Sequence, residues 1–114
     1  MSREAYIQAL LSLYCGLPDT AARKKPSLPD RQLAAHLFDQ GISLFIMETA
    51  LLLAVARRST RDPELPPLPP IRSLAYFLPV VEELQHDPPD PGYLGYLRLR
   101  RDNMVNFSTD RGER

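Results

Sequence analysis

The 114-residue sequence contains little of the chemistry that most enzymes and secreted domains need. Its one cysteine, Cys15, excludes an internal disulfide. Its two histidines, His36 and His86, are far apart and lack the spacing of metal ligands relative to each other or to Cys15. Glycine-rich phosphate loops and nucleophile motifs are missing as well. We therefore expect no enzymatic activity, no cofactor and no bound metal.

The sequence also has no excess of charge and no long apolar run. Its 14 basic and 14 acidic residues give a formal net charge of +0, so the whole chain does not attract nucleic acid or an anionic membrane. The longest apolar stretch, residues 44–56, contains Glu48 and Thr49, whereas a bilayer span needs about 20 apolar residues. The N-terminus lacks a signal-peptide pattern. We expect a soluble, cytoplasmic protein without a membrane partner.

Helical periodicity dominates the remaining sequence. Few β-branched residues and only five glycines argue against a sandwich or barrel. The pattern predicts one all-α domain over residues 1–101, a compact bundle of about five helices without a sheet, and a flexible tail over residues 102–114. The expected helices cover residues 3–15, 31–40, 44–58, 74–86 and 91–101.

Capping residues set these boundaries. Gly41 is expected to adopt a left-handed conformation between the second and third helices. Pro79 should kink or restart the fourth helix, because it removes a backbone donor. The third helix is apolar on nearly all sides and should be the most buried element. The expected N-caps are Ser2, Asp30, Ser43, Ser73 and Asp90.

Proline is the residue in excess, with 12 copies against an average of about 5%. Prolines concentrate in residues 17–29 and 62–70, which we expect to be connectors. Pro67 and Pro70 precede Arg72 at the spacing of ligands for SH3-type grooves. A rigid connector packed on the bundle is the alternative, and both interpretations stay open.

Arginines gather near the predicted helix ends. If the C-terminal ends of the third and fifth helices lie side by side, these arginines share one rim that can neutralise phosphates without reading bases. Arginines that only offset helix dipoles are the alternative. The candidate nucleic-acid-binding arginines are Arg57, Arg58, Arg61, Arg72, Arg98, Arg100 and Arg101.

A different class of function, protein–protein docking, fits other features. The apolar third helix, the proline-rich segment with Pro67 and Pro70, or a face formed by Tyr93 and Tyr96 can dock a larger partner. A homodimer formed through the third helix also stays open.

Residues 30–84 carry a recognisable pattern. The turn Asp39-Gln40-Gly41 precedes a helix with Ala50 and Ala54, and Ser73-Leu74-Ala75-Tyr76-Phe77 opens a closing helix with following aliphatic residues. This pattern resembles the C-terminal helical domain of DnaD-like primosomal and phage or plasmid replication proteins. The resemblance implies DNA binding without sequence preference in a bacterial replication or mobile-element system. It also implies that Tyr76 lies with Arg57, Arg58 and Arg72 near the DNA.

Overall fold

The structure, a computed structural model, describes the backbone of residues 1–18 and 26–112 and the side chains of these residues up to 103. The described residues form helices and no sheet, which confirms the predicted all-α class. The elements are α1 (Arg3–Cys15), α2 (Leu28–Asp39), α3 (Leu44–Ser59), the 3-10 helix η1 (Leu74–Phe77), α4 (Leu78–His86) and α5 (Pro91–Gly112). Residues 19–25 of the connector predicted over 17–29 lie outside the described part.

Serine hydroxyls begin three of these elements as predicted. Ser2 Oγ accepts from the Ala5 amide at 3.1 Å, and Ser43 Oγ accepts from the Ile46 amide at 3.2 Å. Ser73 does the same for the first turn of η1. Each hydroxyl satisfies a backbone N–H that has no partner inside its own helix.

The start of α2 differs from the prediction. Asp30 is not the N-cap: Ser27 is, and its Oγ accepts from the Asp30 amide at 3.2 Å. The Asp30 carboxylate accepts in return from the Ser27 amide at 3.3 Å, which completes a capping box. Pro29 fits inside this first turn because the turn leaves its N–H groups unused.

Two prolines mark the later helices. Pro79 lies in the first turn of α4, directly after η1, so the chain restarts its helix there as one of the two predicted outcomes. Pro91 begins α5, which does not end near Arg101 but continues through Gly112 in place of the tail predicted from residue 102. Residues 102–111 contain no proline or glycine, so nothing in that stretch stops the helix.

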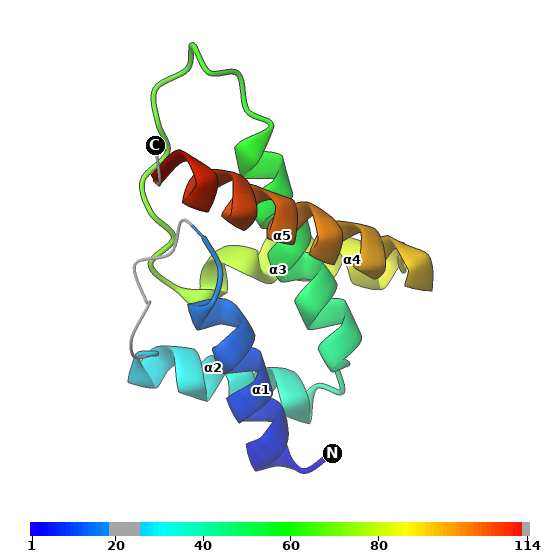
Figure 1. The fold of residues 1–114 in the computed structure, drawn as a ribbon. Coiled ribbons are helices and arrows are strands. Elements are labelled where there is room, and N and C mark those ends of the chain that lie inside the picture. The colour runs from blue at the N-terminus through cyan, green and yellow to red at the C-terminus, as the bar shows by residue number, and fades with distance from the viewer. Residues whose placement is uncertain (19–25, 113–114) are drawn as a thin grey trace.

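The core is built around α3, which runs through the middle of the molecule while α5 lies across it (Figure 1). Ten consecutive residues of α3, Met47–Ala56, are buried, which confirms its predicted central place. The helix α1 packs against α2 and α3, and α4 packs against α3. Each fully buried large apolar side chain contributes about 1.5–3 kcal/mol to folding. Examples from five elements are Leu10, Leu37, Leu51, Phe77 and Leu97.

Within the described part, no helix has the length and apolar character needed to cross a bilayer.

Candidate docking groove at the end of α3

The last turn of α3 presents two of the predicted arginines. Arg57 and Arg58 precede Ser59, the last residue of the helix. Cations are favoured there because the last carbonyls carry partial negative charge. The Thr60 amide and hydroxyl both bond to the Ala56 carbonyl, which closes the helix before the proline-rich segment begins.

Arginines tie the proline-rich segment back to α3. Arg58 donates to the Pro69 carbonyl at 2.8 Å, and Arg61 donates to the Pro66 carbonyl at 2.6 Å. Proline has no N–H, but its carbonyl remains a full acceptor. Residues 62–70 are exposed, whereas the next residue, Ile71, is buried. The segment is therefore an anchored connector, and whether its exposed residues Pro67 and Pro70 also bind a partner stays a prediction.

Two adjoining hollows lie beside the end of α3. One is lined by α3, η1, α4 and this segment, and the other by this segment and the end of α3. They have volumes of about 280 and 250 Å³. Both are lined by Arg58, Arg61 and Leu68. We call the pair the α3 groove. Its remaining lining residues are Ala54, Arg57, Tyr76 and Val80 in the first hollow, and Asp62, Pro63, Leu65 and Pro67 in the second.

Tyr76 forms the aromatic part of the groove. Its side chain is 44% exposed. The Arg58 guanidinium carbon lies 5.6 Å from the ring centroid, and an Arg58 nitrogen donates to the Tyr76 hydroxyl at 3.3 Å. The ring edge also meets Phe77, which is fully buried, with centroids 5.2 Å apart. Tyr76 is thus held in one orientation while part of its surface faces solvent.

The groove arginines differ in their acidic partners. Arg57 donates twice to the Glu83 carboxylate, at 2.6 and 2.9 Å. These hydrogen bonds raise the pKa of Arg57 and lower the pKa of Glu83. Among the described residues, Arg61 has no carboxylate partner, and its bond to a neutral carbonyl leaves its charge uncompensated. The groove therefore combines a paired arginine with one that is available to an acid.

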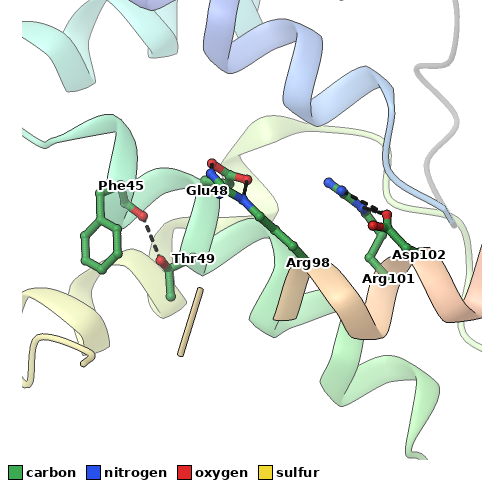
Figure 2. A network of polar contacts seen from close by, with 6 residues as sticks. All are labelled: Phe45, Glu48, Thr49, Arg98, Arg101 and Asp102. Atoms are coloured by element: carbon green, nitrogen blue, oxygen red, sulfur yellow. Dashed lines mark hydrogen bonds and ion pairs between the residues drawn. The ribbon is translucent and has the colours of Figure 1, made fainter. Parts of the chain in front are cut away.

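The other predicted arginines lie elsewhere. Arg98 donates to both oxygens of Glu48 at 2.7 Å, and Arg101 pairs with Asp102 at 3.0 Å (Figure 2). Glu48 precedes Arg57 by nine residues in α3, which corresponds to roughly 14 Å along the helix axis. The structure thus brings Arg57, Arg58, Arg61 and Tyr76 together but does not join them with Arg98 in one rim.

Arg72 and Arg100 also stay apart from the groove lining. Arg72 is exposed and has no hydrogen bond or ion pair with another described residue. Among the residues whose side chains are described, Arg100 donates only to the Tyr96 hydroxyl, at 3.5 Å. The rings of Tyr93 and Tyr96 stack with centroids 6.0 Å apart, so the structure brings this predicted pair together on α5. Tyr96 is 53% exposed and Tyr93 is half-buried.

Sequence reasoning missed the role of Glu48. This carboxylate is 9% exposed and interrupts the apolar run of α3. A buried charge needs a partner, so an acid in the central helix signals that a basic residue must approach it. The sequence does not reveal that the partner is Arg98, 50 residues away. Thr49, the next residue, satisfies its hydroxyl on the Phe45 carbonyl at 2.7 Å (Figure 2).

The remaining candidate chemistry among the described residues is the Cys15 thiol and the histidine and acidic side chains. Burial raises the pKa of the Cys15 thiol, and Asp30 raises it further, so the thiol keeps its proton at neutral pH. Within the described residues, no group of histidine, cysteine and acidic side chains has the arrangement of a metal site.

A hollow of about 530 Å³ between α1 and α2 contains the pairs Arg3–Asp39 and Arg31–Glu4. Its charges are therefore balanced internally.

Comparison with protein-family models, curated proteins and solved structures finds no match to this chain. The resemblance of residues 30–84 to DnaD-like domains consequently stays a prediction from the residues.

Proposed function

We propose that this protein is a non-enzymatic docking domain whose α3 groove receives a segment of a larger protein. The observation that carries the proposal is the exposed ring of Tyr76, which contacts Arg58 and lines the same hollow as Leu68. Tyrosine and arginine contribute most strongly to protein interfaces, because they bury large areas and hydrogen-bond at the same time. A side chain that is already held in place loses little conformational entropy on binding.

The shape of the groove supports a protein segment over a small molecule. It consists of two open hollows of about 280 and 250 Å³ at the surface, whereas a typical small-molecule pocket encloses most of its ligand. Each hollow suits one or two side chains. An extended or helical segment can place successive side chains in both, because the hollows adjoin along Leu68.

Nucleic-acid binding through an arginine rim receives less support from the geometry. Arg98 and Arg101 each donate to a carboxylate, so a phosphate must displace Glu48 or Asp102 to reach them. Displacing Arg98 also strands the buried carboxylate of Glu48. These pairs fit arginines that stabilise the fold.

Site-specific photo-crosslinking tests the docking function. A benzophenone amino acid at Leu68, in the groove, should form a discrete protein adduct in cells, whereas the same residue at Leu99, which is exposed on α5, should not. Tyr76→Ala should remove the adduct. Equal adducts at both positions, or adducts indifferent to Tyr76→Ala, would contradict a docking groove at this place.

Fluorescence anisotropy with short single- and double-stranded DNA separates the two classes of partner. We expect weak binding whose affinity changes little between about 50 and 200 mM salt. A steep fall in affinity over that range, lost in a variant with Arg57, Arg58 and Arg61 changed to alanine, would support nucleic-acid binding instead.

A further inference from the structure

We propose that the α3 groove selects an acidic amphipathic segment, an inference that rests on the docking function. In this arrangement an apolar side chain of the partner packs between Leu68 and Tyr76. Carboxylates that flank this side chain pair with Arg61 and with Arg57. The inference follows from three features of the groove: its floor, its charge and the state of the Arg57–Glu83 pair.

The floor is apolar and open. Leu68 is 39% exposed and Tyr76 is 44% exposed, and Ala54 and Val80 complete the surface between them. These side chains have no polar atom at the floor apart from the Tyr76 hydroxyl, which already accepts from Arg58. An aliphatic or aromatic side chain can therefore cover the carbon atoms of this floor without displacing a hydrogen bond from them.

Three arginines line the rim of the groove. They are Arg57, Arg58 and Arg61, and the carboxylates near them among the described residues are those of Asp62 and Glu83. Asp62 also accepts from the Glu64 amide at 2.9 Å, which holds it in its own turn. Arg61 has no carboxylate partner among the described residues. An incoming acid can form a charge-assisted, two-pronged contact there.

Glu83 behaves as an internal competitor for the partner's acid. Its pair with Arg57 lies at the surface, with both side chains half exposed. Water and salt weaken such exposed pairs, so an incoming carboxylate can replace Glu83 at little cost. Removing the Glu83 charge should therefore strengthen the binding of an acidic segment, which a purely structural ion pair would not do.

The test uses the full chain and three fluorescent probes of similar length. The first is a peptide of about 14 residues with leucines at helical spacing and glutamates between them. The second replaces every glutamate with lysine, and the third is single-stranded DNA. We expect the acidic peptide to bind at least about tenfold more tightly than the basic peptide and the DNA.

Variants locate the binding. Arg61→Ala and Leu68→Ser should each weaken acidic-peptide binding by about tenfold. Glu83→Gln should strengthen it by about two- to fivefold. Arg100→Ala, which changes a half-buried arginine on α5 outside the groove, is the matched control and should leave it unchanged. Circular dichroism confirms that each variant is folded.

Three outcomes would overturn the inference: equal affinity for acidic and basic peptides, preference for DNA, or weaker binding in Glu83→Gln. The same experiments distinguish failure of the acidic-segment inference from failure of the docking function. If the crosslinker at Leu68 captures a protein but the acidic peptide binds no better than the basic one, docking stands and the acidic class is wrong. If neither a protein adduct nor peptide binding occurs, both proposals fail.

Discussion

The buried carboxylate of Asp30 accepts a hydrogen bond from the backbone amide of Leu74, 44 residues later in the chain, at 3.0 Å. Its second oxygen accepts from the Ser27 amide at 3.3 Å. One side chain, 3% exposed, therefore completes the first turn of α2 and satisfies the first turn of η1. Because η1 carries Tyr76, this contact also positions the aromatic part of the α3 groove.

Replacing Asp30 with alanine should destabilise the protein strongly. The substitution strands two backbone donors, one of them buried, so the free energy of unfolding should fall by about 2–3 kcal/mol. Ser43→Ala is the matched control, because it removes one exposed cap and should cost about 1 kcal/mol. Urea denaturation followed by circular dichroism gives both values. Equal losses in the two variants would show that the Asp30–Leu74 contact is not important.

The pair between Arg98 and Glu48 should matter for stability in the same way. Arg98→Ala leaves a nearly buried carboxylate without its partner, and we expect a loss of about 1–2 kcal/mol, reduced because Arg98 itself is half exposed. Arg100→Ala should cost less than about 0.5 kcal/mol. Adding Glu48→Met to Arg98→Ala should recover part of the loss in urea denaturation. An additive double variant would mean that the two side chains act independently.

Two glycines should respond to alanine in opposite directions. Gly41 has a φ of 78°, a left-handed conformation that alanine adopts at a cost of about 1 kcal/mol. Gly95 is exposed on α5, and a methyl group added to its Cα would meet no atom within 4 Å other than its chain neighbours and the backbone of its own helix. Gly95→Ala should therefore stabilise the helix by about 0.5–1 kcal/mol. Thermal unfolding should show a lower midpoint for Gly41→Ala and a higher one for Gly95→Ala. The same sign for both would contradict these backbone assignments.

Tyr6 should make stability depend on alkaline pH. Its hydroxyl is buried without a hydrogen-bond partner among the described residues, and burial raises its pKa from 10.0 to about 12. As pH rises, this tyrosine ionises in the unfolded chain before it ionises in the folded protein. The free energy of unfolding therefore keeps its full value below pH 10 and falls between pH 10 and about 12.

The variant Tyr6→Phe keeps the ring contact with Phe38, whose centroid lies 5.3 Å away. It should be as stable as the unchanged protein at pH 7, or up to about 1 kcal/mol more stable, because no hydrogen bond is lost. Its advantage should widen above pH 10. Urea midpoints measured across this range check both parts. A large loss at pH 7 would reveal a partner for the hydroxyl.

Local chemistry made most of the helices predictable. Ser2, Ser43 and Ser73 fix helix starts within a few residues of themselves, so the sequence alone locates α1, α3 and η1. At α2 two signals compete, and the capping box with Ser27 prevails over a cap at Asp30 because Asp30 reaches back to the Ser27 amide. The buried bond from Asp30 to Leu74 is a long-range contact that no local pattern encodes.

The candidate site was predictable in its parts and not in its assembly. Arg57, Arg58 and Tyr76 are visible in the sequence, but their meeting depends on how the proline-rich segment returns to α3. The separation of Arg98 from them depends on Glu48, a tertiary contact across two helices. Helix periodicity identifies which face is buried and does not state where one helix crosses another.

NMR of the backbone amides of the ¹⁵N-labelled protein tests most directly whether the α3 groove binds an acidic protein segment. Acidic peptide and single-stranded DNA are titrated separately. We predict that the peptide shifts amides around the α3 groove, at Arg61, Leu68, Tyr76 and Val80, while DNA shifts few residues. Shifts caused by DNA along Arg98, Arg100 and Arg101 in α5, with none caused by the peptide in the groove, would contradict this prediction.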